Sequence, residues 1–364
     1  MNVLSVFDGI SAGRLALERA CIKVDKYYRS EIDKYANQVA IHHYPSDIQL
    51  GDITKWREWN IDWSSIDLFI GGSPCQGFSF AGKQAGTKAC LDGKEILVTD
   101  RETYLELKSK GAEFLSQSHL FWEYVLILDH IKKHNPNVKF LLENVKMRKE
   151  LLRMISDSLG VEDIVINSNL VSAQNRHRHY WCNWKVEQLE DKEIYLNHII
   201  DDHVNSYCGA FRGRYLANGE TRQQLEIRED NKTNCLTTVY KDNVVIFNLN
   251  DNKRFKGINE DERGYRPHMG DTKSTGISEL GRILKSSFGK VKTNTLTATH
   301  QAKIALNNDV NNLYYRKLTP MECARLQTFP DGWCESVISD AQAYKAYGNS
   351  WTVDVIAHIF SSLN

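Results

Sequence analysis

The first half of the chain alternates short apolar runs with segments of helical periodicity. The runs are rich in Val and Ile, and several are apolar throughout, as is typical of strands buried on both faces of a sheet. They are Val3–Phe7, Tyr27–Ser30, Ile48–Leu50, Ile66–Ile70, Phe140–Leu142 and Ile164–Ile166. In Leu120–Ile131 the apolar residues recur at three- and four-residue steps, which predicts a helix with one buried face. This alternation predicts an α/β fold with a doubly wound, mostly parallel, Rossmann-like sheet.

The pattern changes in the second half, where a long stretch is polar, rich in Asn, Thr and Gly, and has no long helical pattern. Helical periodicity returns at Thr319–Gln327 and Val353–Phe360. We therefore expect a discontinuous α/β domain of residues 1–184 and 316–364, with a smaller β-rich domain of residues 185–315 inserted into it.

A short internal echo lies in the polar stretch. Lys232–Thr238 resembles Lys292–Ala298, and a short β-like run follows each. Two similar hairpins and a β-rich lobe built from a duplicated unit explain the echo equally well. A duplicated lobe would serve to contact a substrate.

Composition limits the classes of function. The chain has 46 Lys and Arg against 46 Asp and Glu, so its formal net charge is zero. A protein that coats nucleic acid would be strongly basic, whereas an enzyme with one cleft needs only local positive charge. No run approaches the roughly 18 apolar residues that cross a bilayer. The first residues form a predicted strand and not an export signal, so we expect a cytosolic protein that binds no membrane.

The chain has eight cysteines, which are spread over its length with no Cys-x-x-Cys spacing. This pattern predicts neither a disulfide framework nor a structural zinc site, so we expect no metal. We expect most of the cysteines to be buried thiols, and any functional one must be recognised by its surroundings.

Three candidate ligand-binding groups follow the first three predicted strands. The segment Phe7–Gly13 reads Phe-Asp-Gly-Ile-Ser-Ala-Gly and leads into a helix. Glycines in such a turn let backbone N–H groups and a helix N-terminus approach a ligand closely. Glu31 ends the second strand, where a carboxylate can hold ribose hydroxyls, and Asp52 follows the third. Each acid alone fits a loop or cap role, but the three together predict an adenosine-containing cofactor.

A candidate nucleophile, Cys75, lies in the sequence Ser-Pro-Cys-Gln directly after a central predicted strand. The thiolate is the reactive form, and an ordinary thiol with a pKa near ~8.5 is only a few per cent ionised at neutral pH. A buried structural thiol is the alternative. The rigid proline and the flanking glycines favour the nucleophile.

Two further motifs carry candidate polar groups. Glu143 ends an apolar strand in Glu-Asn-Val, and a buried Glu can be held protonated and donate to a ring nitrogen, or it can cap the next helix. Arg176 and Arg178 lie on the same side of an extended segment. Their guanidinium groups could bind a ring oxygen or phosphates, or they could mark an exposed strand edge.

These motifs together resemble the DNA cytosine-5 methyltransferase family. The ordered set is Phe-Asp-Gly-x-x-x-Gly, Ser-Pro-Cys-Gln, Glu-Asn-Val and Gln-x-Arg-x-Arg. Arg316–Pro330 and the Gly-Asn-Ser of residues 348–350 are similar to the last two blocks of the family. The resemblance spans nearly the whole chain. It implies the S-adenosylmethionine-dependent methyltransferase fold with an inserted target-recognition domain.

The resemblance also implies a reaction. A cytosine is flipped out of duplex DNA, and a methyl group is transferred to its carbon 5. Cys75 would add to carbon 6, while Glu143 would bind N3 and the 4-amino group. Arg178, with Arg176 behind it, would bind the cytosine O2. The segment after Cys75 would close over the DNA and exclude water.

By the same resemblance the methyl donor is S-adenosylmethionine, and S-adenosylhomocysteine is released. Phe7 would pack on the adenine, the backbone of the following turn would hold the methionine part, Glu31 would bind the ribose and Asp52 the adenine amino group. Asn349 would close the pocket. The full set of expected cofactor contacts is Phe7, Asp8, Gly9, Ile10, Ser11, Gly13, Glu31, Ile32, Asp52, Ile53, Pro74, Asn349 and Ser350.

Two regions depart from compact family members. Residues 90–117 form a longer segment with a predicted short helix at Tyr104–Lys108, which could contact DNA, order the neighbouring loop or cover the surface. The recognition domain matches no pattern that reveals its target sequence. The expected DNA contacts, in the loop after the nucleophile and in that domain, are Gln76, Ser79, Arg212, Arg214 and Arg282.

Two alternatives differ in substrate or in activity. Relatives that methylate transfer RNA usually carry Thr where this chain has Ser79, and the long recognition domain also favours DNA. A non-catalytic DNA-binding homologue would normally have lost the nucleophile or the cofactor block. The resemblance thus implies a stand-alone, monomeric enzyme in the cytoplasm of a bacterial or phage-infected cell. It would be either an orphan or the partner of a restriction endonuclease that acts on the same site.

Overall fold

The computed structural model describes residues 1–75, 77–78, 88–200, 206–215, 221–228, 230–238, 243–248 and 313–363. The chain divides into two compact units. Unit 1 comprises Met1–Asn167, His177–Glu190 and Ser350–Asn364, and unit 2 comprises Ser168–Arg176 and Asp191–Asn349. These units do not share the expected boundaries, because residues 168–176 and 316–349 belong to unit 2. The domain assignment stays a prediction.

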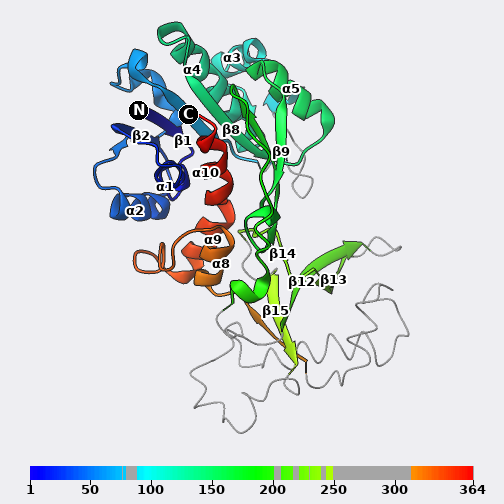
Figure 1. Ribbon diagram of the computed structural model, residues 1–364. Coiled ribbons are helices and arrows are strands. Elements are labelled where there is room, and N and C mark those ends of the chain that lie inside the picture. Colours follow the sequence, from blue (N-terminus) through cyan, green and yellow to red (C-terminus); the bar gives the residue numbers. More distant parts are fainter. Residues whose placement is uncertain are drawn as a thin grey trace. The chain divides into compact units, whose positions relative to one another are not determined.

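Unit 1 is built on a seven-stranded sheet (Figure 1). In spatial order its strands are β3 (Ile48–Gln49), β2 (Lys26–Ser30), β1 (Asn2–Val6), β4 (Leu68–Gly72), β8 (Lys139–Val145), β11 (His177–Cys182) and β9 (Asp163–Asn167). Neighbours from β3 to β8 are parallel, whereas β11 is antiparallel to both β8 and β9. The predicted doubly wound, mostly parallel sheet is therefore confirmed. The antiparallel β11 was predicted only as an extended segment.

Helices cover both faces of this sheet, with α1, α2 and α10 on one side and α4 and α5 on the other (Figure 1). Their bounds are α1 (Ala12–Arg19), α2 (Lys34–His43), α4 (Phe121–His134), α5 (Lys149–Leu159) and α10 (Val353–Ser361). The short 3-10 helices of unit 1 are η1 (Ile53–Glu58), η2 (Trp63–Ser65) and η3 (Gln117–Leu120). The helix predicted at Leu120–Ile131 is α4, and its repeating apolar residues are buried against the sheet as expected.

The longer segment after the candidate nucleophile folds as part of unit 1. It contains a three-stranded antiparallel sheet and the predicted helix, with bounds β5 (Lys88–Leu91), β6 (Lys94–Leu97), α3 (Arg101–Ser109) and β7 (Glu113–Phe114). The fully buried Glu123 of α4 connects it to the core, because one carboxylate oxygen accepts from the Tyr104 hydroxyl at 2.6 Å and from the Lys108 ammonium group. Its other oxygen accepts from the Trp56 indole at 2.9 Å. This buried group of donors fixes the segment to α4.

The described part of unit 2 is rich in β structure, with two small sheets and four short helices. Its elements are η4 (Ser168–Leu170), β10 (Gln174–Asn175), η5 (Leu196–His198), β12 (Ser206–Tyr215), β13 (Thr221–Arg228), β14 (Thr233–Asn234), β15 (Asn243–Asn248), β16 (Leu313–Lys317), α8 (Pro320–Leu326) and α9 (Asp340–Asn349). Strands β13, β12, β15 and β16 form an antiparallel sheet, and β10 pairs with β14 in parallel. Lys232–Thr238 contains β14, whereas its echo at Lys292–Ala298 lies outside the described residues.

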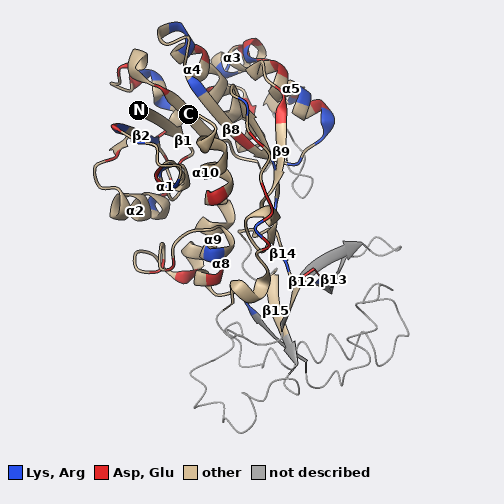
Figure 2. Ribbon diagram, in the orientation of Figure 1, with Lys and Arg blue, Asp and Glu red and all other residues tan. Residues whose placement is uncertain are grey.

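Acidic and basic residues are mixed along the helices of unit 1, as the neutral net charge of the chain suggests (Figure 2). Helix α5, for example, carries Lys149 and Arg153 together with Glu150 and Asp157. Within the described ranges, no helix has the length and apolar character that a membrane crossing requires.

The eight cysteines, all of which the structure describes, form no disulfide. Half of them are buried, so the prediction that most of the cysteines are buried is wrong. The buried ones are Cys182, Cys208, Cys323 and Cys334. Burial raises the pKa of the Cys334 thiol to about 12 and raises the pKa of Cys182 as well. Such thiols are inert, whereas the candidate nucleophile Cys75 is only half-buried.

Candidate active site

The carboxyl ends of the central strands bring several predicted site residues to one edge of the sheet. The strand order reverses between β1 and β4, and ligands of doubly wound sheets bind at this switch point. Gly72 at the end of β4 lies opposite Glu143 of β8, and Cys75 follows three residues after Gly72. Arg178 on β11 lies opposite Val145 of β8. The candidate nucleophile, the candidate acid and one of the two arginines thus come from the turn after β4 and from the neighbouring strands β8 and β11.

Glu143 is nearly buried, with 8% of its surface exposed, and each of its carboxylate oxygens has a donor. Arg178 Nε lies 2.9 Å from Oε1. Trp351 Nε1 donates to Oε2 at 3.1 Å. Two donors on separate oxygens hold the carboxyl group in one orientation. Neither the pairing of Glu143 with Arg178 nor the contact with Trp351 was predicted from the sequence.

The turn that carries Cys75 is held by backbone and side-chain hydrogen bonds. The Asn144 amide donates to Ser73 Oγ at 2.9 Å and to the Ser73 carbonyl at 3.3 Å. The Cys75 carbonyl accepts from Phe78 N at 3.0 Å. Further along, Gly77 N donates to the buried Ser118 hydroxyl at 2.9 Å. These contacts fix the backbone on both sides of the thiol.

Asn144 and Ser118 were not predicted as contributors to this turn. Asn144 is part of the Glu-Asn-Val motif, and its position directly after Glu143 was the available signal. Ser118 had no signal, because its contact joins residues 41 positions apart. Trp351 directly follows Gly-Asn-Ser, so an aromatic residue beside a family block was its only signal.

The turn after β1 has an unusual backbone. Phe7, Gly9 and Ser11 have φ of 57°, 58° and 63°, so left-handed residues alternate with others. A β carbon on Gly9 would meet no heavy atom within 4 Å, so glycine is needed here for its backbone conformation and not for space. The alternation turns the chain sharply from the strand into α1.

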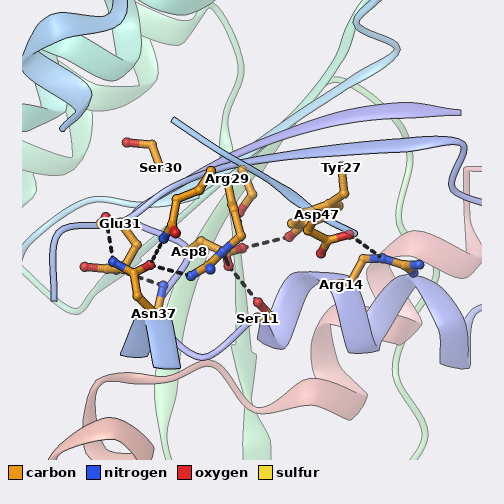
Figure 3. A network of polar contacts seen from close by, with 12 residues as sticks. Asp8, Ser11, Arg14, Tyr27, Arg29, Ser30, Glu31, Asn37 and Asp47 are labelled. Carbon is orange, nitrogen blue, oxygen red and sulfur yellow. Dashed lines mark hydrogen bonds and ion pairs between the residues drawn. The ribbon is translucent and has the colours of Figure 1, made fainter. Parts of the chain in front are cut away.

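The Asp8 carboxylate holds this turn through hydrogen bonds from four side chains (Figure 3). Its Oδ1 accepts from the Ser5 hydroxyl at 2.7 Å and from the Tyr27 hydroxyl at 2.8 Å. Its Oδ2 accepts from the Ser11 hydroxyl at 2.8 Å and from Arg29 Nε at 3.1 Å. The side chains of Asp8 and Arg29 are 0% and 1% exposed. Asp8 is thus a structural carboxylate, and only its backbone could face a ligand.

The N-terminus of α1 has no side-chain cap, because the Ser11 hydroxyl donates to Asp8 instead. Backbone N–H groups in the first turn of a helix favour an anionic ligand such as a carboxylate. Gly13, in that first turn, presents no side chain. The N-terminus of α1 is therefore suited to bind an anionic group.

Glu31 follows β2 and lies beside the same turn. Its carboxylate accepts from Gly9 N at 2.9 Å and from Ile32 N and Asp33 N, both at 2.8 Å. Burial raises the pKa of Glu31, and these N–H groups partly oppose that shift. The carboxylate is therefore positioned by the first turn itself.

The other expected cofactor contacts differ in exposure. Ile32 has 68% of its surface exposed beside Glu31, whereas Ile10 and Ile53 are 1% and 5% exposed. Asp52 caps η1, since Oδ1 accepts from Thr54 N at 2.8 Å. An exposed isoleucine such as Ile32 can cover a flat apolar ring of a ligand. Pro74 is half-buried, and Ser350, in unit 1, is buried.

Two predicted site residues belong to unit 2. Arg176 is buried, and its Nη1 donates to Cys235 Sγ at 3.3 Å and to the carbonyls of Leu236 and Gly348 at 3.4 and 3.5 Å. Asn349 is the last residue of α9. The two arginines of the Gln-x-Arg-x-Arg motif therefore lie in different units, and Arg178 contacts Glu143.

Most of the expected DNA contacts cannot be placed. Gln76, Ser79 and Arg282 lie outside the described residues. Arg212 and Arg214 are on β12, at positions paired with Gln224 and Arg222 of β13. Their roles stay predictions.

The fold and site define a class, and comparisons with known proteins identify the family. The structure is similar to that of DNMT2 from Spodoptera frugiperda, with a TM-score of 0.53, 18% identity, and coverage of 100% of this chain and 99% of that one. At this identity the similarity concerns the fold, which is that of a methyltransferase. A family model described as C-5 cytosine-specific DNA methylase matches residues 1–106 and 107–364. The chain belongs to this family.

Curated relatives agree with this assignment. The orphan methyltransferase M.SPBetaI of Bacillus phage SPbeta is 26% identical over 450 residues, covering 100% of this chain and 97% of its own. The type II methyltransferase M1.ScrFI of Lactococcus lactis subsp. cremoris is 28% identical over 364 residues, covering 98% of this chain and 76% of its own. The predicted family is confirmed.

Proposed function

We propose that this protein transfers a methyl group from S-adenosylmethionine to carbon 5 of a cytosine in duplex DNA, with Cys75 as the covalent nucleophile. The observation that carries the proposal is the arrangement at the edge of the sheet. Cys75 follows β4, Glu143 lies on the neighbouring strand β8, and Arg178 on the next strand, β11, contacts Glu143. Family membership supports the same reaction.

The residues of the chain divide the chemistry between them. The Cys75 thiolate forms a bond to carbon 6 of the flipped cytosine. Glu143 donates a proton or hydrogen bond to N3 and contacts the 4-amino group, so electron density accumulates at carbon 5. Carbon 5 then takes the methyl group as the bond between that group and the donor sulfur breaks, which leaves S-adenosylhomocysteine. Arg178 binds O2 and neutralises charge as it develops. After methylation, loss of the carbon 5 proton and breakage of the bond to Cys75 restore the aromatic ring.

The groups around the first turn fit S-adenosylmethionine, which supplies an activated methyl group when it is bound. The uncapped start of α1 suits the carboxylate of the methionine part. Glu31 suits the ribose hydroxyls, and the exposed Ile32 beside it suits a face of the adenine. These assignments rest on charge, exposure and position in unit 1.

Methyl transfer with radiolabelled S-adenosylmethionine tests the proposal directly. Duplex DNA and transfer RNA are offered in parallel, and the modified base is identified by nucleoside analysis. We expect label in 5-methylcytosine of duplex DNA, which would make the protein a DNA (cytosine-5-)-methyltransferase. Label found only in the RNA would contradict the proposal.

Bisulfite sequencing of DNA from cells that express the protein would reveal the bases around the target. The relatives include orphan and type II enzymes, so a partnership with a restriction endonuclease is a separate prediction. An endonuclease that cuts at the methylated sequence, and is blocked by the methylation, would support it. Without such a nuclease in the same cell, the orphan role applies.

A further inference from the structure

Trp351 lies between the predicted cofactor turn and the predicted catalytic acid. It precedes α10, and it is 208 residues from Glu143 in the sequence. Its indole Nε1 donates to Glu143 Oε2 at 3.1 Å, while Arg178 Nε lies 2.9 Å from Oε1. All three residues belong to unit 1. The two donors thus approach the carboxyl group from different segments.

Two glycines make room for the indole. A β carbon on Gly72 would lie 2.7 Å from Trp351 Nε1 and 3.1 Å from Glu143 Oε2. A β carbon on Gly13 would lie 3.3 Å from Trp351 Cζ3. A real β carbon could not lie 2.7 Å from the indole nitrogen. The absence of a side chain at Gly72 therefore permits the hydrogen bond between Trp351 and Glu143. The indole therefore extends from the first turn of α1 to the carboxyl group.

A carboxyl group with one donor can still rotate about its last bond, because that torsion is broad. A second donor on the other oxygen fixes its plane. We propose that Trp351 is a positioning residue, which holds Oε2 of Glu143 so that the acid meets the target base in a fixed orientation. The inference rests on the function proposed above, since it assigns Trp351 a role through Glu143.

The indole N–H acts on the orientation of Glu143. Its loss should therefore lower the rate of methyl transfer at saturating S-adenosylmethionine and DNA more than it weakens the binding of either. A residue that only fills space would instead affect stability.

The Trp351→Phe variant keeps an aromatic ring and removes the N–H. We expect the single-turnover methyl-transfer rate on duplex DNA to fall on the order of 10-fold at neutral pH, which matches the loss of one charge-assisted hydrogen bond. Binding of S-adenosylhomocysteine, measured by calorimetry, should change much less than the rate.

Trp184→Phe is the matched control. Its indole Nε1 donates to the Ile359 carbonyl at 3.0 Å, so the variant also removes one indole hydrogen bond from unit 1. This variant should keep the wild-type rate. Thermal unfolding of both variants shows whether each is folded.

Gly72→Ala provides a second approach if Trp351→Phe proves unstable. The added methyl group must displace the indole N–H, so the variant should slow methyl transfer in the wild-type background. It should slow the reaction much less in the Trp351→Phe background, where no N–H remains to displace. Equal effects of Gly72→Ala in both backgrounds would contradict the positioning role.

The results separate this inference from the proposed function. If the wild-type protein methylates DNA and Trp351→Phe keeps the wild-type rate, the role of Trp351 is wrong and the function stands. If the wild-type protein does not methylate cytosine in DNA, the proposed function fails, and the role of Trp351 fails with it.

Discussion

Asp8 and Glu143 are both buried carboxylates near the carboxyl ends of strands in one sheet, yet their surroundings differ. Asp8 accepts hydrogen bonds from four side chains, which fill the roughly four lone-pair sites of a carboxylate. Glu143 has one donor on each oxygen. Its remaining lone pairs can meet a ligand, whereas those of Asp8 cannot.

The comparison shows that burial alone does not mark a catalytic acid. Asp8 is the more buried of the two and shapes the backbone of the cofactor turn. Tyr27 follows the same logic, because burial and the Asp8 charge hold the pKa of its hydroxyl well above the ordinary value and keep it a donor. A buried acid with open lone pairs beside a nucleophile is the better candidate for chemistry.

The largest effect is expected at Glu143. Glu143→Gln keeps the shape of the side chain but removes the proton that it gives to the base. We expect methyl transfer to fall roughly 100- to 10,000-fold, as for loss of a general acid. The melting temperature should change by only a few degrees. Single-turnover assays with saturating duplex DNA measure the rate, and retention of more than a tenth of wild-type activity would contradict the role.

The same change at Asp8 should act on stability instead. In Asp8→Asn the new amide N–H₂ faces donors, and Arg29 loses its buried counter-charge, which costs about 3–5 kcal/mol. Urea unfolding followed by circular dichroism measures this loss. Glu187→Gln is the control, because Glu187 pairs with Lys185 on the surface. An Asp8→Asn variant that is as stable as Glu187→Gln would contradict the structural role of Asp8.

A smaller effect is expected at Asp47, which lies at the edge of the Asp8 network (Figure 3). Arg14 Nε is 3.8 Å away, and burial raises the pKa of Asp47 from 3.8 to about 6. The folded state then binds the proton more tightly than the unfolded state. Its contribution to stability is therefore complete below about pH 4 and is lost as the pH rises toward about 6.

The Asp47→Asn variant has no carboxyl group at this position, so it does not lose stability through this titration. Its melting temperature, relative to wild type, should rise by a few degrees between about pH 4 and pH 7. Scanning calorimetry at a series of pH values measures the difference. Parallel pH profiles for the two proteins would show that Asp47 does not titrate in this window.

Several strands of the parallel sheet could be predicted because they are short apolar runs, as in Val3–Phe7 and Ile66–Ile70. Strand β11 was harder, because His177–Cys182 begins with charged and polar residues and its apolar run is confined to Tyr180–Cys182. Its antiparallel position between β8 and β9 depends on tertiary pairing, which no local pattern reports.

The candidate site also has one part that the sequence predicted and another that it did not. The positions of Cys75, Glu143 and Arg178 followed from family motifs. The contact of Trp351 with Glu143 and the four donors around Asp8 could not be predicted, because packing brings together side chains that local patterns do not relate. The expected boundaries at residues 184 and 316 came from composition, which does not report which segments contact one another.

Trapping on duplex DNA with 5-fluorocytosine at the target position tests the central claim most directly. Fluorine at carbon 5 cannot leave as a proton does, so the bond between Cys75 and carbon 6 should persist. With S-adenosylmethionine present, we predict a covalent protein–DNA complex that survives denaturing electrophoresis, with Cys75 as the attachment site in mass spectrometry. A complex that still forms with Cys75→Ser, or none with the wild-type protein on DNA that it methylates, would contradict the account.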